Sequence, residues 1–337
     1  MTLKKSLALS FAFPILLALV GMLFCAEASI GQTPQQRLVP EDYATPEAAL
    51  FAANPGDTIL LGSADWFTNL FIDKPVTIRG RGDARLLAAR GDAPIIQVRS
   101  EGVTIQELDF ASGIIGVEGL AEATGLFVTR CSFNEIFGDG IRCIGCRQIA
   151  ISNCSITNCA GRGVFLDQVD GFDIAQVFAA FNGGSGFELF AKNGFVSFNT
   201  LQANQFAGLS VQGSDMGFVG NEIDSNFETG AFFFNSQRIS FQANSASFNT
   251  GFGVGVLSIG VEAALFAGND VLRNFGIGLL FDDTRSTALE SNEVSGNFGV
   301  GAYYSPSTSD NFVSGNEFSD NLFDAGVIDE GNNFIAD

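Results

Sequence analysis

The sequence predicts an all-β protein, a right-handed parallel β-helix with a short N-terminal capping helix. Three observations lead to this fold class: paired asparagines recur with a period of 22–25 residues, a glycine follows most pairs, and short apolar runs alternate between them. A repeat of this length indicates a solenoid whose units pack only on their neighbours. Period-two alternation broken by glycine and asparagine is typical of short strands. We expect roughly 11 coils with three short strands each.

The paired asparagines form two columns, five residues apart, that define the coils. With the glycine that follows each pair, they are Asn199/Asn204/Gly208, Asn221/Asn226/Gly230, Asn244/Asn249/Gly253, Asn269/Asn274/Gly278, Asn292/Asn297/Gly301 and then Asn316/Asn321. Toward the N-terminus the columns continue as Val177/Asn182/Gly186, Cys154/Cys159/Gly163 and Cys131/Ile136/Gly140. Stacked coils lie ~4.8 Å apart, so a buried asparagine can hydrogen-bond to its counterparts above and below. We therefore expect both columns at turns, pointing at least partly inward.

Three segments resemble a known superfamily. Residues 311–321 read NFVSGNEFSDN, and nearer the N-terminus residues 45–58 read TPEAALFAANPGDT and residues 73–80 read DKPVTIRG. They are similar to the pectate-lyase-like superfamily, above all to its NosD-like group of secreted right-handed β-helix proteins, over roughly residues 41–335. The resemblance implies a capping helix followed by the first coils. It implies little about activity, because one fold hosts many functions.

The N-terminal region predicts secretion. Lys4 and Lys5 precede an apolar run over residues 7–24, and Ala-Glu-Ala at 26–28 resembles a cleavage site. The alternative is a retained membrane anchor, because the apolar run approaches the length of a membrane span. Thr45 and Pro46 predict the N-cap and first position of the capping helix. The expected organisation is a signal peptide over residues 1–28, a linker over 29–40 and one β-helix domain over 41–337.

The charge balance excludes some classes of partner. The chain has a formal net charge of −20 at pH 7 and contains no histidine. Nucleic acids and anionic membranes attract basic surfaces, so neither is an expected partner once the signal is cleaved. An acidic surface fits a secreted monomer, extracellular or periplasmic, that stays soluble or holds cations. The 35 phenylalanines are expected to stack inside the solenoid.

Five cysteines follow the predicted signal peptide and lie within two coils. They are Cys131, Cys143, Cys146, Cys154 and Cys159. Cys131 and Cys154 occupy one column in adjacent coils, and the ~4.8 Å rung spacing falls within the range that a disulfide can bridge. The alternative is that these cysteines replace asparagine as small inward residues. The sequence leaves the pairing open.

The absence of histidine removes nucleophile–histidine pairs, histidine general bases and zinc–histidine sites. Three carboxylates, Asp270, Glu293 and Glu317, follow the first asparagine column in successive coils and should stand in an outward row. They are a candidate metal site, with calcium as the expected ion and Arg273 as the other possible partner. A solvated acidic stripe is the alternative.

A second acidic feature provides weak catalytic candidates, Asp282, Asp283 and Arg285. An inverting glycosidase needs two carboxyl groups on opposite sides of the sugar. The expected ladder neighbours of Asp283 are Ser258 and Pro306, so no carboxylate stacks beside it. Turn chemistry is the simpler explanation of this segment.

The sequence therefore favours a secreted, non-catalytic β-helix that binds carbohydrate or serves as a surface scaffold. This expectation depends mainly on the resemblance, and extracellular polysaccharide is the expected partner. The alternative is a polysaccharide lyase or glycoside hydrolase with a degenerate acidic site. A metal-insertion accessory role, as in the copper-maturation group, lacks support because histidine is absent and only three methionines occur.

Overall fold

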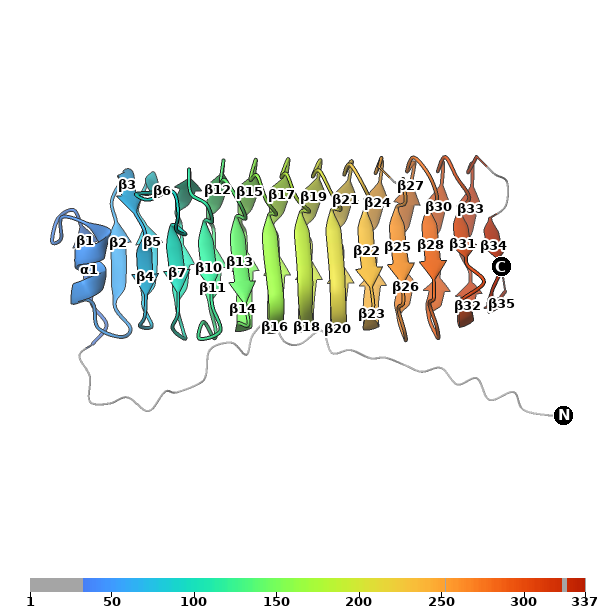
Figure 1. The fold of residues 1–337 in the computed structure, drawn as a ribbon, viewed down its shortest axis with the longest axis horizontal. Coiled ribbons are helices and arrows are strands. Elements are labelled where there is room, and N and C mark those ends of the chain that lie inside the picture. The colour runs from blue at the N-terminus through green and yellow to red at the C-terminus, as the bar shows by residue number, and fades with distance from the viewer. Residues whose placement is uncertain (1–32, 252, 323–325, 337) are drawn as a thin grey trace. The chain divides into compact units, whose positions relative to one another are not determined.

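Three rows of parallel strands wind around a common core and make up the fold (Figure 1). The structure is a computed structural model, and it describes residues 33–251, 253–322 and 326–336. From Pro34 onward these residues form one structural unit, and successive turns stack in chain order. The predicted signal peptide, residues 1–28, lies outside the described residues.

Each turn contributes one strand to each row. The first row contains β4 (Leu70–Ile72), β7 (Ile96–Val98), β10 (Val117–Gly119), β13 (Ile141–Ile144), β22 (Ala231–Phe234), β25 (Val256–Ile259), β28 (Leu279–Asp282), β31 (Ala302–Tyr304) and β34 (Val327–Asp329). The second row contains β1 (Gln36–Val39), β2 (Thr58–Leu61), β5 (Thr77–Gly80), β8 (Thr104–Gln106), β11 (Phe127–Thr129), β14 (Arg147–Ser152), β23 (Gln237–Gln242), β26 (Leu265–Ala267), β29 (Ala288–Glu290), β32 (Ser309–Ser314) and β35 (Asn332–Ile335). Three long strands run through both rows: β16 (Val164–Ala175), β18 (Phe187–Ser197) and β20 (Leu209–Val219).

The third row forms a separate sheet of 12 strands. Its members are β3 (Ala64–Thr68), β6 (Ala84–Ala88), β9 (Asp109–Ala111), β12 (Ser132–Asn134), β15 (Ser155–Thr157), β17 (Phe178–Ala180), β19 (Thr200–Gln202), β21 (Glu222–Asp224), β24 (Ser245–Ser247), β27 (Asp270–Leu272), β30 (Glu293–Ser295) and β33 (Glu317–Ser319). The solenoid has about 13 turns instead of the roughly 11 expected. The first turns were missed because they contain neither the asparagine pair nor its glycine.

The N-terminal end is closed by one helix, α1 (Pro46–Ala52). The Thr45 hydroxyl accepts a hydrogen bond from the Ala48 N–H at 3.2 Å, as an N-cap does, and Pro46 opens the helix as predicted. Strand β1 lies inside the predicted linker and pairs in parallel with β2. The linker prediction for residues 29–40 is therefore wrong over residues 36–39, where alternation too short to recognise in the sequence already forms a ladder.

The asparagine columns are confirmed as buried ladders. The Oδ1 atom of Asn226 accepts bonds from the Asn204 N–H at 3.1 Å and the Asn204 Nδ2 at 3.0 Å. Its Nδ2 donates to the Leu201 carbonyl at 3.0 Å and to Asn249 Oδ1 at 3.1 Å. Each side-chain amide thus forms hydrogen bonds to the adjacent turns, and its own oxygen and nitrogen both have partners, as buried polar groups require.

The prediction that Gly253 belongs to the glycine column is wrong, because Gly255 occupies that position. A Cβ built on Gly230 would meet the Gly255 carbonyl at 2.4 Å, and one on Gly255 would meet the Gly278 carbonyl at 2.9 Å. The column therefore passes through Gly255, where backbones approach too closely for a side chain. Gly253 lies two residues earlier in a widened turn and has a φ of +68°. The insertion explains why this coil is longer than its neighbours.

Candidate functional site

The outward side chains of the first row form one continuous ladder, which we call the outer ladder. Its register is Phe71, Gln97, Glu118, Arg142, Phe165, Glu188, Ser210, Phe232, Leu257, Leu280, Tyr303 and Ile328. These residues alternate with the buried core positions because successive side chains of a strand point to opposite faces. A row of side chains therefore follows the solenoid axis at one per turn. Its members are aromatic or hydrogen-bonding except for the aliphatic Leu257, Leu280 and Ile328.

The first polar cluster lies on β7, β10 and β13. Glu118 accepts a hydrogen bond from Gln97 Nε2 at 2.7 Å and forms an ion pair with Arg142 Nη2 at 3.1 Å. The Glu118 side chain is only 8% exposed, whereas that of Arg142 is 33% exposed. The carboxylate is therefore more deeply buried than the guanidinium that pairs with it, and the Arg142 Nε is itself buried without a hydrogen-bond partner.

The second polar cluster surrounds Arg162, which precedes β16. Asp139 accepts bonds from Arg162 Nε and Nη2, both at 2.9 Å, and Arg162 Nη1 lies 3.4 Å from Glu188 Oε1. The guanidinium carbon lies 3.5 Å from the centre of the Phe165 ring. Burial lowers the pKa of Arg162, but the hydrogen bonds and charges of Asp139 and Glu188 outweigh that effect and raise it. Arg162 is thus a fixed cation stacked on an aromatic ring.

Aromatic side chains continue the face beyond these clusters. Phe165 and Phe190 meet edge to face with ring centres 6.0 Å apart, and Phe232 and Phe234 are tilted at the same distance. Further along, the Tyr303 hydroxyl donates to Glu330 at 2.7 Å. All five rings belong to strands of the first row or to the first-row halves of the long strands. The combination of apolar rings with a few oriented polar groups is what carbohydrate-sized ligands require.

The chemistry available at these clusters is binding chemistry. Both oxygens of Glu118 and both oxygens of Asp139 already accept hydrogen bonds or ion pairs. Charge-assisted hydrogen bonds of this kind hold the guanidinium and amide donors in fixed positions. No histidine exists in the chain to take over proton transfer. The site can orient and stack a ligand.

The weak catalytic candidates lie on β28 and the turn after it. Asp282 accepts bonds from the hydroxyls of Ser305 at 2.5 Å and Ser307 at 2.7 Å, and these bonds lower its pKa. The exposed Asp283 pairs with Arg285 at 3.1 Å. Each carboxylate thus has its own partners. The expected neighbour Ser258 was wrong, because β25 pairs Ser258 with Phe281 and places Ile259 beside Asp282.

The predicted acidic row is in register. Asp270 pairs with Glu293, which pairs with Glu317, and all three are exposed. Arg273 does not join them, because its guanidinium carbon lies 5.7 Å from the centre of the Phe248 ring instead. In the part of the chain that the structure describes, no group of three or more Asp, Glu, Cys or His side chains is arranged to hold a metal ion.

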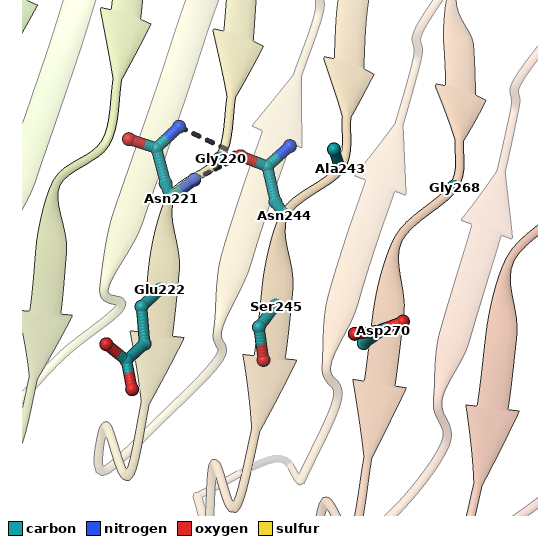
Figure 2. A pocket seen from close by; sticks show the side chains of 8 residues that line it. All are labelled: Gly220, Asn221, Glu222, Ala243, Asn244, Ser245, Gly268 and Asp270. Carbon is teal, nitrogen blue, oxygen red and sulfur yellow. Dashed lines mark hydrogen bonds between the residues drawn. The ribbon is translucent and has the colours of Figure 1, made fainter.

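A shallow depression of about 370 Å³ lies beside this acidic row (Figure 2). It opens where the turn before the first asparagine column carries small residues, Gly220, Ala243 and Gly268. All three have a positive φ, between +51° and +65°, a conformation that favours glycine. Asn221 and Asn244 also line it, and the two hydrogen bonds drawn between them in Figure 2 belong to the buried ladder. The polar groups that the depression offers a ligand are therefore the carboxylates of Glu222 and Asp270 and the hydroxyl of Ser245.

The five cysteines of the described residues are free thiols and are buried. The prediction that these cysteines point inward in place of asparagine is therefore confirmed, and the alternative of a disulfide is wrong. Burial raises the pKa of Cys159 to about 12. No helix among the described residues is long and apolar enough to cross a membrane.

Comparisons with known proteins agree with this architecture. Residues 185–336 match the family described as a right handed beta helix region. The A-module of mannuronan C-5 epimerase AlgE4 from Azotobacter vinelandii superposes with a TM-score of 0.73 at 14% identity, over 86% of this chain and 94% of that one. A search of curated protein sequences finds no match. The fold is thus a right-handed parallel β-helix.

Two further solved structures share the fold. The periplasmic alginate epimerase AlgG has a TM-score of 0.58 at 14% identity, over 87% of this chain and 84% of that one. The Dettilon tailspike protein has a TM-score of 0.63 at 14% identity, over 89% and 68%. The chain is a right-handed parallel β-helix repeat protein. Identities this low establish the fold alone.

The sequence analysis did not predict the outer ladder, because its members differ in chemical type. A signal was nevertheless present: Arg142, Phe165 and Glu188 are separated by 23 residues each, which is the repeat period. Searching each column for polar and aromatic residues at outward positions would have found them.

Proposed function

We propose that this protein is a secreted polysaccharide-binding β-helix without catalytic activity, and that the outer ladder is its binding face. The observation that carries the proposal is the register itself, in which each turn places one outward group in line with the next. The rung spacing of ~4.8 Å is close to the length of one sugar residue in an extended chain. A linear glycan lying along the axis would therefore meet equivalent positions on successive turns.

The ligand best supported is a neutral polysaccharide. A protein with a net charge of −20 repels polyanions at a distance. The two arginines near the ladder, Arg142 and Arg162, are both paired with carboxylates and leave little uncompensated positive charge. Phe165, Phe190 and Phe232 supply apolar faces for pyranose rings, and Gln97 and Ser210 add uncharged hydrogen-bonding groups.

Binding and turnover are tested together with a panel of neutral and acidic polysaccharides. Calorimetry measures affinity, while ultraviolet absorbance and reducing-end assays detect lyase and hydrolase products. We expect binding of a neutral glycan without product. The double variant Phe165→Ala/Phe190→Ala should weaken it by about tenfold or more, since losing aromatic anchors costs ~1–2 kcal/mol. Phe195→Ala, on the second-row half of β18, is the matched control and should bind normally.

Two results would reject the proposal. Product formation that disappears in Asp282→Asn or Glu293→Gln would establish the enzyme alternative. Absence of binding across the panel, or binding that is unchanged in the double variant, would remove the outer ladder as the site.

Secretion and calcium also belong to the proposal. The apolar run after Lys4 and Lys5 supports an extracellular or periplasmic location, tested by N-terminal sequencing of the exported protein. No resident cofactor is proposed. Calcium is supported only by the rung-to-rung alignment of Asp270, Glu293 and Glu317. Thermal unfolding with millimolar calcium against magnesium tests it, and an unchanged midpoint would exclude it.

A further inference from the structure

The tripeptide Arg-Gly-Asp occurs twice near the N-terminal end of the solenoid, at residues 81–83 and again at residues 90–92. The first copy lies between β5 and β6, and the second lies between β6 and β7. Both copies are at the surface. A guanidinium and a carboxylate on either side of a glycine form a compact pair of opposite charges that a protein partner can bind through charge-assisted hydrogen bonds.

The first copy is tied into the coil. The Arg81 guanidinium pairs with the Glu41 carboxylate. The Ser63 hydroxyl donates to the Arg81 carbonyl at 3.1 Å and accepts from the Asp83 N–H at 3.2 Å. A Cβ built on Gly82 would meet the Ser63 Oγ at 2.3 Å. The guanidinium and the backbone of this copy are therefore already engaged within the protein.

The second copy forms the tip of an open loop. The side chains of Arg90 and Asp92 are 70% and 82% exposed, and a Cβ built on Gly91 would meet nothing within 4 Å. The Arg90 Nε lies 3.4 Å from the Asp92 Oδ1. An ion pair this exposed contributes little, because water competes for both charges. Both side chains are therefore available to a partner.

A buried-side clamp fixes the base of this loop. Asn69 lies in the turn between β3 and β4, one coil earlier. Its Oδ1 accepts from the Arg90 N–H at 2.8 Å, and its Nδ2 donates to the carbonyls of Pro94 at 2.8 Å, Ala93 at 3.3 Å and Arg90 at 3.4 Å. One amide thus joins both ends of the loop, and the proline ring restricts the backbone there. A loop fixed in this way loses less conformational freedom when it binds.

We propose that the loop at residues 90–92 is the recognition site for an extracellular receptor that carries a divalent cation. The Asp92 carboxylate completes the coordination of that cation, and the Arg90 guanidinium pairs with a receptor carboxylate. Adhesion receptors of the integrin class combine these two features. The cation also offsets repulsion between an acidic receptor surface and a chain of net charge −20. Such a receptor lies outside the cell, in agreement with the secretion proposed above.

The test coats a surface with the purified protein and measures the adhesion of cultured fibroblasts, which carry several receptors of this class. We expect adhesion in manganese that is lost in EDTA and is inhibited by a soluble Gly-Arg-Gly-Asp-Ser peptide. Asp92→Glu should reduce it by about tenfold or more and leave the circular dichroism melt unchanged, because the side chain is exposed. Asp83→Glu makes the same change in the first copy and is the matched control that should adhere like the parent.

A second variant tests the clamp, and the glycan assay separates the two sites. Asn69→Ala should weaken adhesion with Arg90 and Asp92 still present, and all three loop variants should bind glycan as the parent does. The proposal is overturned by an absence of adhesion in manganese, by adhesion that persists in EDTA, or by adhesion that is unchanged in Asp92→Glu. Loss of adhesion in Asp83→Glu alone would also overturn it and assign the receptor to the first copy.

Discussion

Replacing Asn226 with leucine should remove one rung of the buried amide ladder with little change in side-chain size. The substitution deprives the Asn204 N–H of its acceptor at 3.1 Å and the Leu201 carbonyl of its donor at 3.0 Å. The Asn204 Nδ2 keeps its bond to the Ala179 carbonyl, and the Asn249 Oδ1 keeps the backbone N–H of residue 226. Two buried backbone groups are therefore left without these partners.

Each buried polar group without a partner costs about 1–3 kcal/mol, so the free energy of unfolding should fall by about 2–6 kcal/mol. Urea unfolding followed by far-ultraviolet circular dichroism measures this loss. Glu222→Gln is the control, because Glu222 is exposed in the same coil and should change stability by less than about 0.5 kcal/mol. A loss for Asn226→Leu no larger than that of the control would refute the view that the ladder holds the turns together.

Three further predictions concern charge and thiols. Glu293→Gln should raise the free energy of unfolding at low salt by a few tenths of a kcal/mol, because it removes like charges on adjacent rungs, and the gain should shrink with added salt. Urea unfolding measures the change, and a loss of stability in calcium-free buffer would contradict this. Hydrogen bonds from Arg238 lower the pKa of the Asp215 carboxyl to about 2. The stability that this pair contributes is therefore complete above the ordinary carboxyl pKa and is lost as the pH falls through about 2. In Arg238→Ala, carbon NMR titration should show the pKa of Asp215 rise toward its usual value. The buried thiols, Cys159 among them, should not react with a thiol reagent at pH 8 until the protein is unfolded, and rapid labelling of the native protein would show that the coils open there.

The fold was predictable because one physical constraint repeats in it. A buried asparagine needs another asparagine at the same position in the next turn as its hydrogen-bond partner. Asn199, Asn221 and Asn244 therefore recur in the sequence at a nearly constant spacing. Turns without this constraint show no repeat that can be recognised in the sequence. The strand β1 and the first turns have no amide ladder, and the turn count was underestimated for that reason.

The outer surface was harder to predict because solvent-facing positions do not require the same residue type in every turn. Arg142, Phe165 and Glu188 share one column but differ in chemistry, so the column shows no repeated residue type in the sequence. The expectation that phenylalanine serves the core holds for Phe218 and Phe241, which are fully buried, but not for exposed rings such as those of Phe275 and Phe298. Only the register of the turns shows which exposed residues lie in line.

The most direct test of the binding proposal is a crystal structure of the protein with a neutral oligosaccharide selected from the panel. The account predicts an intact sugar chain lying parallel to the solenoid axis on the outer ladder, with pyranose rings against Phe165 and Phe232 and against Phe190 in the neighbouring column. A cleaved product, or a ligand seated beside the acidic row at Asp270 with the outer ladder empty, would contradict it.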